Sequence, residues 1–124
     1  MKEKQNLVIL KLLQLHCYFV EESEYDDVFL NYNGKKIWPV DKKQQPIMMD
    51  TTTELNLTID NLALYQEVEI ELWDWDMLTP NDLLGTFNLI IEGKNQQFST
   101  DMIQNPKQTS RAKYTLSWEL VDTE

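Results

Sequence analysis

The sequence is organised around residues 68–85, which read Val68-Glu69-Ile70-Glu71-Leu72-Trp73-Asp74-Trp75-Asp76-Met77-Leu78-Thr79-Pro80-Asn81-Asp82-Leu83-Leu84-Gly85. Apolar and acidic residues alternate from Val68 to Leu72, and this period of two predicts a strand with one buried and one solvated face. The loop that follows places three aspartates, Asp74, Asp76 and Asp82, within nine residues. Because like charges this close repel one another, the loop predicts a site for a hard cation.

The rest of the chain is a series of strand patterns separated by turn signals. Residues 7–19 are rich in Leu, Val and Ile, and Asn33-Gly34 is the two-residue signal of a tight hairpin between residues 28–32 and 35–38. Further strands are expected at residues 51–60, 68–72, 84–91, 96–101 and 113–120. We expect loops at residues 21–27, 41–46 and 103–110, and a short connection with room for one helical turn at residues 61–66. These patterns predict an all-β fold, an eight-stranded antiparallel β-sandwich.

Length and composition indicate a single globular domain over residues 1–124. Hydrophobic residues make up 42% of the sequence, which argues against disorder. Acids outnumber bases by 21 to 11 and give a net charge of -10, so nucleic acid is a poor partner and an anionic membrane would be approached only with a cation. Lys11 interrupts the apolar N-terminal run, and no stretch approaches the roughly 18 apolar residues of a membrane span. We therefore expect a cytoplasmic monomer, peripheral to a membrane when docked.

The sequence offers little for catalysis. Cys17 is the only cysteine and His16 the only histidine, which leaves no disulfide framework, no cysteine-rich zinc site and no well-supported Ser-His-Asp arrangement. Asp74 and Asp76 could formally act as acid and base, but a chain of 124 residues has no cleft-forming insertion. We expect Cys17 to pack as a small buried hydrophobe, and we expect the protein not to be an enzyme.

The order of these patterns resembles that of a C2 domain, a family of calcium- and lipid-binding β-sandwiches. The resemblance rests on the strand ending in Asp74-x-Asp76, on Asn81-Asp82 followed by an apolar pair and Gly85, and on the acidic loop, lysine-bearing hairpin and aromatic-rich last strand. It covers nearly the whole chain and implies a free-standing C2-like domain. The calcium ligands implied in the third top loop are Asp74, Asp76 and Asp82, with the backbone carbonyl of Trp75.

A C2 calcium site also takes acids from the first top loop. Where the family has two spaced aspartates, this sequence has Glu21, Glu22, Asp26 and Asp27. Asp26 or Asp27 matches the second position, whereas the first would be a glutamate, whose extra methylene shifts the carboxylate. The resemblance therefore adds Glu21, Glu22, Asp26 or Asp27 to the ligands for Ca²⁺, an ion that accepts irregular oxygen coordination.

Structural alternatives stand beside these roles. Aspartates in loops also cap backbone amides, which would explain Asp74, Asp76 and Asp82 without a metal. Met77 and Leu78 at the loop tip would insert among lipid headgroups, as the resemblance implies, or fold back onto the edge of the sandwich. Lys35 and Lys36, which Lys42 and Lys43 follow, would contact an acidic headgroup or partner, or would keep an exposed strand from aggregating.

Two functions follow from these observations. The first is a calcium-binding C2-like module that docks on a membrane surface, through anionic phospholipid, or on a protein partner. The second is a metal-independent protein–protein interaction module, an adaptor in a larger assembly, for example a bacterial one, in which sandwich faces or edge strands contact the partner.

Overall fold

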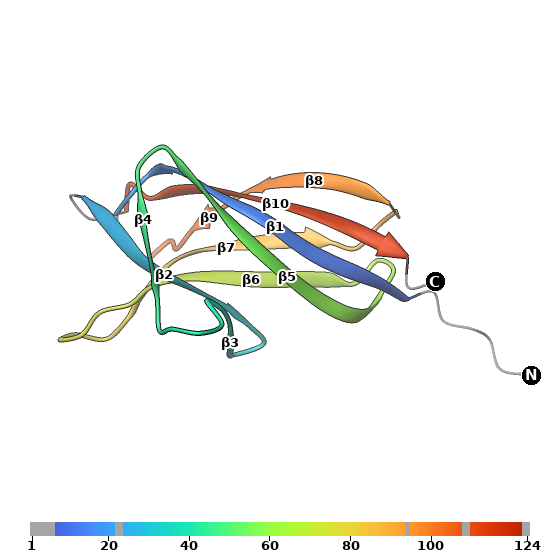
Figure 1. Cartoon of the computed structure of the whole chain (residues 1–124), viewed down its shortest axis with the longest axis horizontal. Coiled ribbons are helices and arrows are strands. Elements are labelled where there is room, and N and C mark those ends of the chain that lie inside the picture. The colour runs from blue at the N-terminus through green and yellow to red at the C-terminus, as the bar shows by residue number, and fades with distance from the viewer. Residues whose placement is uncertain (1–6, 22–23, 94, 108–109, 123–124) are drawn as a thin grey trace, which may run out of the picture.

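The computed structural model describes residues 7–21, 24–93, 95–107 and 110–122, and these form ten strands. The strands are β1 (Leu7–Phe19), β2 (Tyr25–Tyr32), β3 (Lys35–Trp38), β4 (Gln45–Met48), β5 (Thr51–Ala63), β6 (Glu67–Asp74), β7 (Asp82–Ile90), β8 (Gln96–Asp101), β9 (Ile103–Gln104) and β10 (Lys113–Asp122). They lie in two layers that form a sandwich (Figure 1). The predicted all-β antiparallel sandwich is confirmed, but it has ten strands in place of the eight expected, because β4 and β9 lie in segments predicted to be loops.

One layer is a four-stranded sheet in the order β5-β1-β10-β8, and the other is a sheet in the order β3-β2-β6-β7-β9. All strand pairs are antiparallel. β4 also pairs with β2, along its first half, while β3 pairs with its second half. β3 and β4 together therefore form one interrupted edge of this sheet.

The core lies between the two sheets and follows the alternation of the sequence. Val68, Ile70 and Leu72 of β6 are buried, whereas Glu67 and Glu69 are exposed. Tyr114, Leu116, Trp118 and Leu120 of β10 are buried in the same alternating manner. Cys17 is buried among them as expected, and burial raises the pKa of its thiol.

The hairpin at Asn33-Gly34 is confirmed, with φ angles of 53° and 77° at the two turn residues. Both residues thus have the left-handed backbone that a tight two-residue hairpin turn requires, which is why Asn-Gly is favoured there. The turn fixes the pairing of Tyr32 with Lys35 and brings the lysines of β3 to the edge of the sheet.

The segments expected between the strands differ most from the structure. The expected loop at residues 21–27 ends early because Tyr25–Asp27 open β2, and the expected loop at 41–46 ends in β4, where an edge position accommodates Pro46. The loop at 103–110 begins with β9, a two-residue strand against β7. Residues 61–66 hold no helical turn, because β5 continues to Ala63. In the part of the chain that the structure describes, no helix is long and apolar enough to cross a membrane.

Gly85 allows β9 to approach β7 closely. A Cβ atom at this position would overlap the carbonyl oxygen of Ile103 and lie 2.6 Å from Cγ of Met102. The glycine that closes residues 68–85 is therefore required by packing.

We expect Gly85→Ala to lower the free energy of unfolding by roughly 1–3 kcal/mol, because the overlap involves backbone that cannot turn aside. Urea unfolding followed by tryptophan fluorescence measures this change. Thr86→Ala, at the next position of β7, is the matched control and should cost less. Equal stability of Gly85→Ala and the unaltered chain would contradict this account of the β7–β9 contact.

Candidate functional site

The connections β1–β2, β4–β5 and β6–β7 lie at one end of the sandwich, at the left of Figure 1, whereas the start of β1 and the end of β10 lie at the other. The β6–β7 connection is the three-aspartate loop. The fold thus brings residues 24–27 of the first predicted acidic segment and residues 74–82 of the second to the same end of the molecule.

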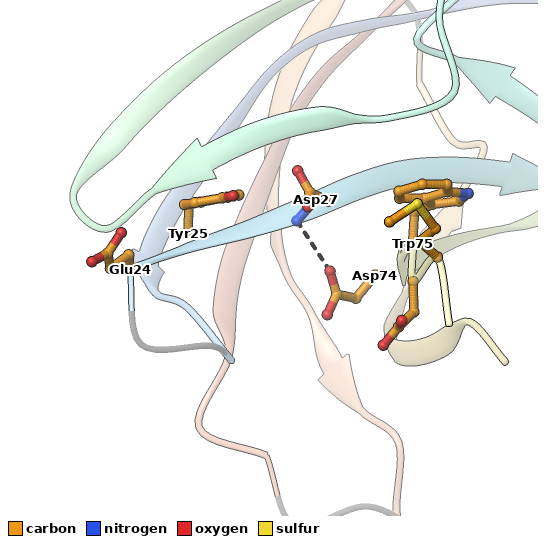
Figure 2. A pocket seen from close by; sticks show the side chains of 7 residues that line it. Glu24, Tyr25, Asp27, Asp74 and Trp75 are labelled. Carbon is orange, nitrogen blue, oxygen red and sulfur yellow. Dashed lines mark hydrogen bonds between the residues drawn. The ribbon is translucent and has the colours of Figure 1, made fainter. Parts of the chain in front are cut away.

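A cleft of about 410 Å³ opens between these segments. Figure 2 shows its lining residues, which are Glu24, Tyr25, Asp27, Asp74, Trp75, Asp76 and Met77. Four of the seven are acids, and two are aromatic. Asp27, Asp74 and Asp76 were predicted to share a site, and the structure brings them together.

Pairing between β2 and β6 holds Asp27 beside Asp74. The backbone amide of Asp27 donates to Oδ1 of Asp74 at 3.0 Å, and the amide of Trp75 donates to the carbonyl oxygen of Asp27 at 2.6 Å. Asp74, at the end of β6, is only 6% exposed. These bonds fix the entrance of the β6–β7 loop relative to β2.

Asp76 has the capping role that the structural alternative describes. Its Oδ1 accepts the amides of Leu78 at 2.9 Å and Thr79 at 3.3 Å, while its own amide donates to Oδ1 of Asn81 at 2.8 Å. Hydrogen bonding from the Thr79 side chain and from these amides lowers the pKa of Asp76. The carboxylate stays ionised and exposed at the rim of the cleft.

Asp27 faces the cleft, and its environment disfavours the ionised carboxylate. Desolvation and the neighbouring carboxylate of Asp26 both raise the pKa of Asp27. The folded protein therefore binds a proton at Asp27 more tightly than the unfolded chain does, so the ionised form of this residue lowers stability.

Asp26 points away from the cleft, which corrects its prediction as a first-loop calcium ligand. It is fully buried, and its Oδ2 accepts the hydroxyl of Tyr114 at 2.6 Å. Both carboxylate oxygens also lie 3.0 Å from the amide nitrogen of Glu21. Because neighbouring residues of a strand face opposite sides, Asp27 rather than Asp26 reaches the cleft.

Two of the remaining predicted ligands, Glu21 and Asp82, are not among the lining residues of the cleft. Glu21 Oε2 accepts a hydrogen bond from the Ser110 hydroxyl, and Asp82 opens β7 opposite Asp74. Glu22 lies outside the described residues. Among the residues that the structure describes, no three His, Cys, Asp or Glu side chains form a group that could hold a metal ion in this arrangement.

The tip of the β6–β7 loop is apolar and projects from the sandwich. Met77 is 76% exposed and Leu78 is 89% exposed. Neither side chain folds back onto the sandwich edge, and their insertion among lipid headgroups stays a prediction. They adjoin the acidic cleft on its outer side.

A second, smaller pocket of about 220 Å³ lies beside the first, between the β6–β7 loop and the lysines. It is lined by Phe29, Lys36, Lys43, Trp75 and Asn81. Lys35 and Lys36 are exposed on β3, and Nζ of Lys36 donates to the carbonyl of Lys42. Trp75 separates the acidic cleft from this basic pocket because it lines both.

Some lining residues were not anticipated from the sequence. Glu24 and Tyr25 lie in the segment expected to be an acidic loop, but their place depends on where β2 begins. Phe29, which stacks on Trp73 with ring centroids 6.2 Å apart, belonged to a strand without a predicted role. The alternation of this strand predicts that Phe29 lies on the outer face of the sheet. It does not predict that Phe29 and Asn81 line the same pocket.

Comparison with known proteins supports the fold. No family model matches the chain. Copine-E from Dictyostelium discoideum is 31% identical over 65 residues, which are 49% of this chain, and the chain spans 11% of the length of that protein. The first of the C2 domains of plant extended synaptotagmin 1, domain A, superimposes with a TM-score of 0.54 and 10% identity, covering 99% of both chains.

Two larger structures contain a similar unit. Human GIVD cytosolic phospholipase A2 gives a TM-score of 0.58 at 15% identity over 99% of this chain and 17% of its own. The paired C2 domains, A and B, of extended synaptotagmin 2 give 0.58 at 15% identity over 98% of this chain and 42% of theirs. The chain shares the β-sandwich architecture of these structures. The chain has the C2 fold, as residues 68–85 predicted.

The titration of Asp27 predicts a pH-dependent effect of Asp27→Asn. Without added metal, we expect the variant to be more stable than the unaltered chain at neutral pH, since it removes a carboxylate that is costly when ionised. The difference should shrink as the pH falls through the raised pKa of Asp27 towards the ordinary aspartate value of 3.8, below which this carboxyl is protonated in the folded and unfolded chain alike. Melting temperatures between neutral and acidic pH measure it, with Asp41→Asn on an exposed loop as the control. A pH-independent difference would refute this assignment.

Proposed function

We propose that the protein is a C2-like docking module that binds calcium in the acidic cleft and uses this end of the sandwich to bind an anionic phospholipid surface. The observation that carries the proposal is the position of Asp27, Asp74 and Asp76 in one cleft, directly beside the exposed Met77 and Leu78. The position of these groups supports a binding role, and we propose that the protein is not an enzyme.

The residue types of the cleft are those that a hard cation prefers, and its carboxylates would have to draw together around the ion from the positions they hold in this structure. Asp27, Asp74 and Asp76 supply carboxylate oxygens, the ligand type that calcium prefers, and the carbonyl of Trp75 lies in the same loop. The raised pKa of Asp27 reflects a carboxylate that is poorly solvated and close to another, an environment that a positive charge would relieve. When bound, calcium would supply positive charge at the end of a molecule whose net charge is -10.

The two exposed apolar residues and the basic pocket would then contact the membrane. Met77 and Leu78 extend beyond the acidic rim and can enter the headgroup region once that rim is neutralised. Lys36 and Lys43, in the adjacent pocket, provide charges for an anionic headgroup, and Lys35 lies next to Lys36 on the hairpin. We place this docking at a cytoplasmic membrane surface, with the protein as a peripheral monomer.

Calcium titration with thermal unfolding tests the metal site. A ligand at a hundredfold excess over its Kd that binds only the folded state should add about 2.7 kcal/mol of stability. We expect calcium to raise the melting temperature of the unaltered chain and to have little effect on Asp76→Asn, which loses one charged ligand. Asp41→Asn is the control and should respond as the unaltered chain does.

Asp27→Asn provides a second test of the metal site, because its expected effects on stability without calcium and on the gain from calcium have opposite signs. This variant should be more stable than the unaltered chain without calcium and should gain less from calcium. An unchanged melting temperature of the unaltered chain in millimolar calcium would exclude the metal site and leave the metal-independent interaction module as the function.

Liposome co-sedimentation tests the docking end. We expect binding to vesicles that contain phosphatidylserine to require calcium, and Leu78→Glu to weaken it by about tenfold or more, because an apolar contact is lost and a negative charge meets the anionic surface. Ile90→Glu, at an exposed position of β7 remote from the loops, is the matched control. Equal sedimentation with calcium and with a chelator would rule out a calcium-dependent switch.

A further inference from the structure

The side of the sandwich where β5 faces β3 and β4 is open. β5 is the edge strand of one sheet, while β3 and β4 form an edge of the other. β4 and β5 diverge from the turn that joins them (Figure 1), and no strand ladder connects them within the described residues. A groove of about 580 Å³ lies along this opening.

The groove has an apolar floor and a charged rim. Trp38 and Leu55 are buried at its base, while Val40 is 80% exposed on its wall. Its remaining lining residues are Pro39, Asp41, Lys42, Gln45, Thr53 and Glu54. None of these residues lines the acidic cleft, so the groove is a separate surface.

The first part of β5 provides a regular strand edge beside this groove. Residues 51–54 pair with β1 on one side only, and beyond them the register with β1 shifts and Asn56 has a φ of 54°. Thr51, Thr52 and Thr53 are β-branched and favour extended backbone. Thr53 and Leu55 face inwards, whereas Thr52 and Glu54 face outwards. Along such an edge strand, every second residue presents its backbone N–H and C=O groups towards the groove.

We propose that an extended, positively charged segment of a partner protein binds in this groove as an added strand along Thr51–Leu55. An extended backbone can pair with a row of alternating N–H and C=O groups in place of water, so the occupant that we propose is a polypeptide. Its inward side chains meet Trp38 and Val40 and are therefore apolar. Its basic residues complement Asp41 and Glu54, which outnumber the single lysine of the lining, Lys42, and they complement the net charge of -10.

A second copy of this chain is a poorer occupant. Two copies would each bring a net charge of -10, and each would present Asp41 and Glu54 at the same groove. Repulsion between like charges opposes this pairing, whereas a basic segment is attracted.

A random heptapeptide display library, screened against the full chain in the presence of a chelator, tests the proposal. We expect enrichment of peptides that alternate apolar with basic residues. A synthetic copy of an enriched peptide, N-methylated at alternate residues, should bind about tenfold or more weakly, because loss of one or two backbone hydrogen bonds has this effect. Val40→Arg should weaken binding by a similar factor, and Ile90→Arg, equally charged but outside the groove, should not.

Amide hydrogen exchange locates the bound peptide. The expected result is slower exchange of amides within Thr51–Leu55 on adding the peptide. Failure of the library to enrich any sequence, tolerance of N-methylation at every position, or protection at residues 74–81 in place of Thr51–Leu55 would each overturn the proposal. The chelator separates this outcome from the calcium-dependent function, which can fail or hold independently.

Discussion

The register between β2 and β6 is the constraint on which the loop end depends. It places Val28 opposite Asp74, and from this pairing come the bond from the Asp27 amide to the Asp74 carboxylate and the bond from the Trp75 amide to the Asp27 carbonyl. A slip of one residue would turn Val28 and Leu30 out of the core and Asp27 into it. Burial of the apolar face and formation of the acidic cleft are thus set by the same pairing.

A second constraint joins the first loop to the last strand. Burial of the Asp26 carboxylate would be costly alone, and the Tyr114 hydroxyl and the Glu21 amide offset that cost. Desolvation, with the nearby Asp26 charge, raises the pKa of Tyr114 far above its ordinary range, so the phenol remains a donor. Glu21 is therefore tied to the sandwich interior, while the neighbour of Asp26 in β2, Asp27, faces the acidic cleft.

Local patterns were sufficient to predict most of the fold. Alternation in β6 and β10 and the Asn-Gly turn depend on residues adjacent in sequence, and each was confirmed by the structure. β4 was missed because Pro46 disfavours a strand unless the position is at a sheet edge, and an edge is defined only by the assembled fold. The site was predictable only in part. Spacing placed Asp74 and Asp76 together in the cleft but wrongly added Asp82 to its lining, and the burial of Asp26 depends on Tyr114, 88 residues further along the chain.

The interruption between β3 and β4 has a consequence for how such a domain can diversify. Residues 39–44 leave the sheet edge and return to it, and several of them form one wall of the open groove. Because both strands on either side are anchored to β2, this segment can change in length or composition without altering the register of the sheet. Doubling the length of a flexible loop costs only about 0.6 kcal/mol of closure entropy. Recognition at this side of the sandwich can thus evolve separately from the residues that hold the acidic loop in place.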